Sequence, residues 1–258
     1  MRSDLKAAWD LFVSLLKLPF TLILVLIGKK SVKDLGEPIG VVASYVVEAK
    51  ITFTIIVLNI IMFVWSRFWS EQWMLALMDH PQHMVTGHVY TLFTATYLHA
   101  DLAHLSGNLV MLFFLGRMVE ERLGSVRYLL LYTSVGILAS VVSNVSMLIT
   151  NTPSYALGAS GAIAGVMAAA MLYHPFRITF AGVLPLPTFF IVWTGIYLDA
   201  NGIINPVGNI AYWAHMGGYM ATMFILAITD RDDLKKGLMM NMLTLALVVI
   251  TSVLVGNL

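Results

Sequence analysis

Seven apolar segments, each roughly long enough to cross a lipid bilayer as a helix, dominate this chain beyond residue 45. A helix needs about 20 apolar residues to cross the hydrocarbon core, where lipid offers the backbone no hydrogen-bond partners. Because a helix satisfies its own backbone, the pattern predicts an all-α polytopic membrane protein. The predicted spans lie near residues 50–67, 103–119, 127–149, 158–175, 178–199, 209–228 and 237–256.

The composition agrees with lipid as the main solvent of the chain. Of the 258 residues, 59% are hydrophobic and 11% charged, whereas a soluble domain usually carries about a quarter charged residues. The net charge of +1 gives no electrostatic basis for binding nucleic acid. Because the chain contains no cysteine, disulfides, thiolate catalysis and cysteine metal sites are excluded.

The N-terminal segment, residues 1–45, is expected to be cytoplasmic and to carry an interfacial or shallowly inserted helix. We place this helix between Trp9 and Gly28, broken near Pro19. Its apolar run from Leu18 is short for a full crossing, and lysines follow it where a signal peptide would have small residues. A true additional crossing is the alternative.

Basic residues gather on one side of the predicted spans. If Lys50 is cytoplasmic, the loops on its side are rich in Lys and Arg, whereas the opposite side keeps only Arg67. The other basic residues of the inner side are Arg117, Arg122, Arg127, Arg177, Arg231, Lys235 and Lys236. Since cytoplasmic loops are enriched in such residues, we expect a multi-pass protein of the cell membrane with its N-terminus inside and its C-terminus outside.

The first outer loop, Ser66 to Ala100, is too rich in aromatic and aliphatic residues for a solvated linker. We expect a compact structure at the membrane interface. The loop holds His80, His83 and His88. A metal site is conceivable there, but no cysteine or tight carboxylate cluster supports one, which favours surface histidines.

Ser160 and His215 are polar residues among glycines and alanines, near the outer ends of the fourth and sixth predicted spans. Polar groups inside a membrane are costly, so each suggests a function. If the residues after Ser154 are helical, Ser160 lies roughly 9 Å deep, a depth that His215 matches. A serine nucleophile needs a base, which imidazole supplies. Taken singly, each residue is equally consistent with helix packing.

His104 and Asn108 lie four residues apart, on one face of the second span. Both can donate hydrogen bonds, so they are candidates to stabilise the oxyanion of acyl transfer. Hydrogen bonding between helices is an equally good interpretation. No buried acid is evident beside His215, because we expect Asp199, the nearest one, at a span end facing water.

Three blocks in this order resemble the rhomboid family of intramembrane serine proteases. His99–Asn108 resembles the HxxxN element with its preceding histidine, and Gly116–Gly124 resembles the ExRxG segment. Gly158–Ala162 together with His215–Gly218 resembles the catalytic pair. Two details depart from the family pattern: the usual Trp-Arg pair is missing from the first loop, and Thr222, still a small residue, stands where the GxxxG pattern has a second glycine after Gly218.

The resemblance implies that Ser160 is the nucleophile and His215 the general base. It also implies that His104, Asn108 and the backbone N–H of Ser160 form the oxyanion hole. Neither a cofactor nor a metal ion is implied. The expected partners are transmembrane protein substrates and membrane lipid.

Structural roles are implied for three further residues. Glu120 and Arg122 would tie the inner end of the second helix, and His99 would support the first loop. The family core has six transmembrane helices, which would occupy residues 46–230. Residues 231–258 would then form one added C-terminal transmembrane helix.

The predicted function is that of an intramembrane serine endopeptidase that cleaves transmembrane segments of membrane proteins with a Ser-His dyad. One alternative is a catalytically inactive rhomboid-like protein that binds transmembrane clients. A small-molecule or ion transporter is the other. It would need internal repeats or an ionisable residue at the bilayer centre, and the sequence has neither.

Overall fold

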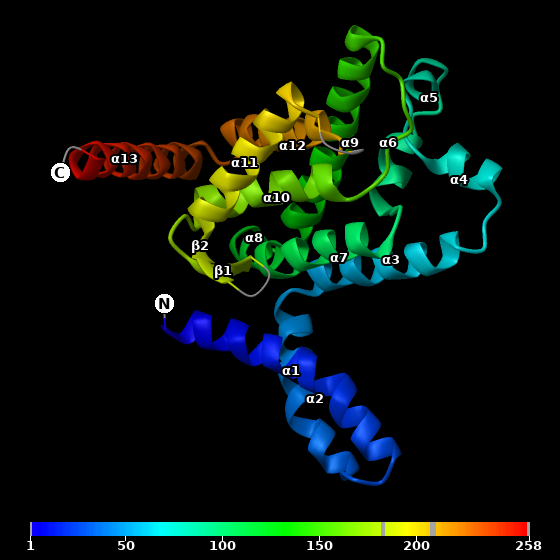
Figure 1. Ribbon diagram of the computed structural model, residues 1–258, viewed down its shortest axis with the longest axis vertical. Helices are drawn as coiled ribbons and strands as arrows, with labels where there is room; N and C mark the ends of the chain where they lie inside the picture. Colours follow the sequence, from blue (N-terminus) through cyan, green and yellow to red (C-terminus); the bar gives the residue numbers. More distant parts are fainter. Residues whose placement is uncertain (1, 182–183, 207–209, 257–258) are drawn as a thin grey trace.

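The computed structural model describes residues 2–181, 184–206 and 210–256 and is mostly helical (Figure 1). The N-terminal half contains α1 (Arg2–Leu26), η1 (Val32–Leu35), α2 (Gly36–Glu48), α3 (Lys50–Ser66), α4 (Glu71–Leu77), α5 (Pro81–Val85), α6 (Thr91–Thr94), η2 (Ala95–Tyr97), α7 (Leu102–Met111), η3 (Leu112–Gly116) and α8 (Arg117–Leu123). The C-terminal half contains α9 (Ser125–Thr150), α10 (Ser160–Tyr173), β1 (Ile178–Ala181), β2 (Leu184–Pro187), α11 (Thr188–Ile204), α12 (Tyr212–Thr229) and α13 (Arg231–Gly256).

Among the described residues, two continuous helical stretches are long and apolar enough to cross a membrane, namely Leu102–Leu123 and Ser125–Thr150. A third crossing is obtained if Val32–Glu48 and Lys50–Ser66, which meet at a bend of 107°, form one span. Shorter apolar helices, such as Ser160–Tyr173, accompany them. The structure is thus that of an all-α membrane protein, apart from one short hairpin.

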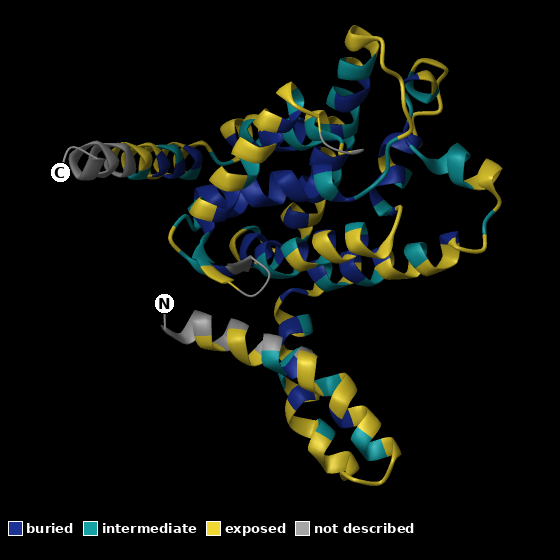
Figure 2. Ribbon diagram, in the orientation of Figure 1, coloured by how far each residue is buried: buried dark blue, intermediate teal, exposed yellow. Residues whose placement is uncertain are grey.

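The core is organised around α10, the continuous dark rod at the centre of Figure 2. Every residue from Gly161 to Leu172 is buried. Helices α7 to α9 and α11 to α13 all contact this helix. A helix that is apolar on all sides is stable only when other helices cover it, as they do here.

Glycines let α10 and α12 touch backbone to backbone. A methyl group at Gly218 would overlap the carbonyl oxygen of Gly161. One turn further along, the hydroxyl of Thr222 lies where a side chain at Gly165 would have to go. The larger residue at 222 is therefore accommodated by a glycine on the opposite helix.

Charged side chains join the elements at the end of α10 that carries Tyr173. Glu120 is buried and accepts hydrogen bonds from the backbone N–H groups of Ile51 and Thr52, at 3.0 and 2.8 Å, so it caps the start of α3. Arg122 forms an ion pair with Asp233 of α13.

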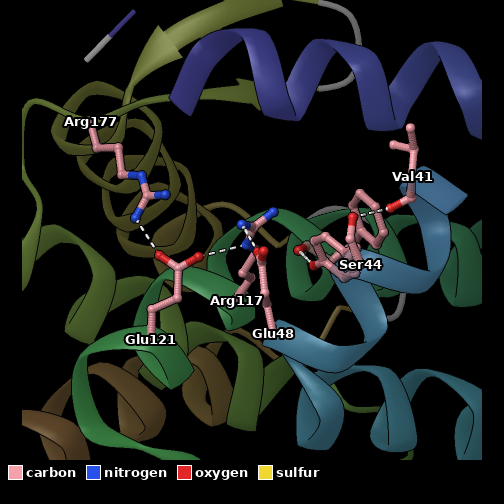
Figure 3. Close-up of polar contacts among 8 residues, drawn as sticks. Val41, Ser44, Glu48, Arg117, Glu121 and Arg177 are labelled. Atoms are coloured by element: carbon pink, nitrogen blue, oxygen red, sulfur yellow. Dashed lines mark hydrogen bonds and ion pairs between the residues drawn. The ribbon is translucent and has the colours of Figure 1, made fainter. Parts of the chain in front are cut away.

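A chain of ion pairs lies nearby (Figure 3). Arg117 pairs with Glu48 of α2 and, at 2.6 Å, with Glu121, which also accepts a 2.8 Å hydrogen bond from Arg177. These pairs connect α2, α8 and the turn before β1. Because these side chains are partly exposed, the ion pairs mainly orient the connected segments and add little to the free energy of unfolding.

The N-terminal segment forms a hairpin of α1 and α2 that projects from the helical body (Figure 1). The expected break near Pro19 is wrong, since α1 continues through this residue. A proline removes only one hydrogen bond of the ladder, and α2 packs beside α1. The 107° bend into α3 sets the hairpin nearly perpendicular to that helix.

The predicted fifth span, 178–199, is wrong in its bounds. Ile178–Ala181 and Leu184–Pro187 pair as antiparallel strands, and the helix runs from Thr188 to Ile204. Pro185 and Pro187 explain the difference, because two prolines so close together remove two backbone donors and disfavour the helical conformation of the residues before them. Residues 182, 183 and 209, which belong to the predicted fifth and sixth spans, lie outside the described residues.

Helix α13 packs against the body through its first turns, where Leu234 and Leu238 meet Leu172 and Leu226 and Asn241 donates to the carbonyl of Met171. Beyond them it extends away from the body (Figure 1). A seventh span across the same membrane therefore stays a prediction.

Gly218→Ala should destabilise the protein, because the added methyl group meets a backbone oxygen that cannot move aside. Overpacking of this kind typically costs about 1–3 kcal/mol. Gly40→Ala in α2 is the matched control, since no atom lies within 4 Å of the new methyl group. It should be neutral or stabilise by up to about 1 kcal/mol. Thermal unfolding in detergent measures both, and an unchanged melting temperature for Gly218→Ala would contradict the proposed close contact.

Candidate active site

Ser160 is the first residue of α10, and the segment that leads to it is not helical. The condition for the depth of roughly 9 Å, a helix from Ser154 onward, is therefore not met. The first N–H groups of a helix have no partner within it, so those of Ser160 and Gly161 lie at the open, electropositive end of α10.

The first loop holds this irregular segment in place. Asp79 and Ala156 exchange backbone hydrogen bonds of 2.9 and 2.8 Å, and Gly158 donates to the carbonyl of Ala95 at 2.9 Å. The Asp79 side chain is buried and accepts a 2.9 Å hydrogen bond from Asn144 of α9. The position of Ser160 thus depends on a loop that lies far from it in the sequence.

His104 and Asn108 approach Ser160 from α7. Gly158 has a φ of +124°, and a side chain there would overlap the imidazole ring of His104 and contact the amide nitrogen of Asn108. Glycine is therefore required at position 158, both by the backbone conformation and by the close approach of the His104 ring. The structure brings both predicted donors to the segment that enters α10.

His99 is fully buried behind these donors. Its Nε2 lies 2.9 Å from the Asn108 amide nitrogen, and its ring centre lies 5.0 Å from that of His104. An amide nitrogen carries two hydrogens, so Asn108 can bond His99 and still donate once more. Arg67 donates to the carbonyl oxygens of His99 and Ala100, at 2.8 and 3.2 Å. This arginine anchors the loop in which the expected Trp-Arg pair is missing.

His215 reaches the site from α12. It lies three residues before Gly218 and therefore on the same face of the helix, toward α10. A side chain at Gly161, next to Ser160, would contact Ala214, next to His215. Four polar residues from three helices thus converge at the start of α10.

Asp199 is the site residue that the sequence interpretation placed wrongly. It is only 8% exposed, and its Oδ1 lies 2.7 Å from Nδ1 of His215. Its Oδ2 accepts a 3.0 Å hydrogen bond from the hydroxyl of Tyr219. Because α11 begins and ends later than expected, Asp199 lies within this helix rather than at its end. One signal could have revealed it: Asp199 is the only acidic residue between Glu121 and Asp230.

The histidines of the first loop and one cavity lie away from this arrangement. Within the described ranges, no group of three or more His, Asp or Glu residues could hold a metal ion. His80, His83 and His88 instead bond neighbouring groups of their own loop. A cavity of about 610 Å³ lies at the opposite end of α10, beside Tyr173 and α13.

Comparison with known proteins yields one family. The family model of the Rhomboid domain matches residues 86–232. The chain is 34% identical over 141 residues to Rhomboid protease GluP of Bacillus subtilis (strain 168), covering 55% of this chain and 26% of that protein. It is 33% identical over 136 residues to RHOMBOID-like protein 1 of Arabidopsis thaliana, covering 51% and 32%.

A third relative is RHOMBOID-like protein 12, mitochondrial, of Arabidopsis thaliana. The chain is 26% identical to it over 192 residues, which cover 66% of this chain and 56% of that protein. The matches thus span between about a quarter and just over half of the length of these relatives.

Asp79 should make stability depend on pH, because burial raises the pKa of this carboxyl above its ordinary value of 3.8. A raised pKa means that the folded state binds the proton more tightly. The resulting stabilisation of the folded state is complete below pH 3.8, the ordinary pKa of the carboxyl. It is lost as the pH rises through the folded-state pKa. Asp79→Asn should lack this dependence, so the melting temperature of the wild type relative to the variant should rise as the pH falls. Parallel melting curves at all pH values would contradict the burial effect.

Proposed function

Since this chain belongs to the rhomboid family, we propose that it is an intramembrane serine endopeptidase that cleaves transmembrane segments of membrane-protein substrates. Family membership makes the chain an integral membrane protein of this class. The cleavage activity, the dyad and the substrates are the proposed part.

One observation carries the proposal: the start of α10 and the face of α12 with His215 meet where neither helix has side chains to separate them. Ser160 and His215 flank this contact. The imidazole of His104 and the amide nitrogen of Asn108 lie against Gly158, in the segment that leads to Ser160. These contacts support acyl transfer, which needs a nucleophile beside a base and hydrogen-bond donors for the oxyanion.

In the proposed reaction, the Oγ of Ser160 attacks the carbonyl carbon of the scissile peptide bond while His215 takes the hydroxyl proton. The negative charge on the carbonyl oxygen is stabilised by Asn108, His104 and the N–H of Ser160. His215 then gives its proton to the leaving amine, and a water molecule hydrolyses the acyl-enzyme by the same steps.

Several finer assignments belong to the proposal. Residues 46–230 form the six-helix core, and residues 231–258 form an added C-terminal transmembrane helix. The N-terminus lies in the cytoplasm and the C-terminus outside the cell membrane. The one-sided distribution of Lys and Arg supports this orientation.

Ser160→Ala and His215→Ala should each reduce cleavage of single-span membrane-protein substrates to background, while the variants still fold. The reason is that a serine without a base, or a base without a serine, cannot form the acyl-enzyme. Ser106→Ala is the matched control, since this exposed serine bonds only a carbonyl of its own helix, that of Leu102. Cleavage is followed by gel assay with purified protein.

Retained cleavage in Ser160→Ala would rule out the mechanism. A wild type that binds single-span substrates without cleaving any of them would instead favour a catalytically inactive rhomboid-like protein.

Asn108→Ala should lower kcat by roughly 100-fold with little change in KM. Removal of one oxyanion donor typically costs about 100- to 1,000-fold, and we expect the lower end because three donors share the charge. The melting temperature of the variant must be compared as well, since Asn108 also contacts His99. A change in KM alone would identify Asn108 as a binding residue.

A further inference from the structure

Asp199 is an unusual residue for its surroundings. It lies in α11, an apolar helix, and it is almost fully buried. An ionised carboxylate in such a place is unfavourable unless specific donors compensate for the lost water. Here each carboxylate oxygen has one donor on α12, the ring nitrogen Nδ1 of His215 for Oδ1 and the hydroxyl of Tyr219 for Oδ2.

This pairing determines which nitrogen of His215 is free. A carboxylate can only accept hydrogen bonds, so the Nδ1 that faces it carries the proton. Nε2 of the neutral ring then keeps its lone pair, which is the form that can accept a proton from serine. The negative charge also stabilises the imidazolium that forms once the proton has moved.

We propose that Asp199 is the positioning residue of His215, an inference that rests on the proposed function. The site would then operate as a Ser-His-Asp triad rather than as a dyad alone. Tyr219 in turn orients Asp199. Its hydroxyl approaches α11 at Gly195, where a side chain would contact it at 3.2 Å. The hydrogen bond from Tyr219 holds Oδ2 of Asp199 in place, and Oδ1 faces His215.

The alternative role for Asp199 is a purely structural one, a polar clamp between α11 and α12. The two roles predict different behaviour with pH. Among the described residues, Asp199 is the acidic side chain that bonds His215, and the hydroxyl of Tyr219 bonds Asp199 in turn. Removal of Asp199 should therefore change how His215 titrates, whereas loss of a clamp should lower activity equally at every pH.

The test uses the full chain in detergent and compares Asp199→Asn and Tyr219→Phe with two controls. Asp232→Asn removes an exposed carboxylate, and Tyr197→Phe removes a hydroxyl from a tyrosine that is 70% exposed on α11. We expect Asp199→Asn to lower kcat/KM by about 100- to 10,000-fold through kcat. Tyr219→Phe should lower it by about 10-fold, because one hydrogen bond to a charged group is lost. Both controls should match the wild type.

The pH dependence of kcat/KM separates positioning from clamping. Without the carboxylate, the protonated form of His215 is less stable, so the acid limb of the Asp199→Asn profile should move to lower pH. A uniform loss at all pH values, accompanied by a lower melting temperature, would establish the structural clamp and overturn the proposal. Wild-type kinetics in Asp199→Asn would overturn it as well.

A measurement independent of turnover distinguishes this proposal from the proposed function. The ring signals of isotopically labelled histidine are titrated by NMR in the Ser160→Ala protein, with and without Asp199→Asn, and His215 is assigned by its absence in His215→Asn. A midpoint that differs between the two proteins supports the pairing even if the wild type cleaves no substrate. An identical midpoint overturns the pairing even if the wild type is an active protease.

Discussion

The backbone contact between α10 and α12 is the interaction on which the rest of the structure depends. In lipid, helices are not driven together by the hydrophobic effect, so close packing has to hold them. The backbones of Gly161 and Gly218 approach so closely that any side chain at position 218 would clash with the carbonyl oxygen of Gly161. Since both helices are rigid, this contact also determines which residues lie beside it. Ser160 precedes the first glycine directly, and His215 lies one turn before the second.

Around this contact, buried polar side chains fasten the places where the helices begin or the chain is irregular. Glu120 caps the start of α3, Asn144 holds the side chain of Asp79, and Asp199 joins α11 to α12. Each of these polar groups would be unfavourable in the apolar body without its partner. Because the partners come from different segments, each pair orients one segment relative to another.

Apolar periodicity was sufficient to predict the helical class of the chain, whereas the site residues were proposed from small-residue motifs together with the family resemblance, and their catalytic roles stay predictions. Neither kind of pattern could locate helix ends that depend on tertiary contacts. Pro185 and Pro187 indicated the hairpin before α11, but the predicted span 178–199 followed the hydropathy of the segment and ignored its prolines. Asp199 was misplaced for the same reason, since a shift of the helix by a few residues turns a span end into a buried position. Arg67 could not be identified as the loop anchor, because the carbonyl groups that it binds belong to His99 and Ala100, more than 30 residues away.

The most informative of these departures is the start of α10. Had the chain been helical from Ser154 onward, the N–H groups of Ser160 and Gly161 would have bonded carbonyl oxygens one turn earlier. They would then have been unable to serve an incoming oxyanion. The irregular segment prevents this, and it is stable because its own polar groups bond the first loop through Asp79 and Ala95. The loop therefore does more than cover the outer end of the body. By keeping the chain out of a regular helix before Ser160, it leaves the positive end of α10 open beside Ser160, which is the electrostatic arrangement that the proposed reaction requires.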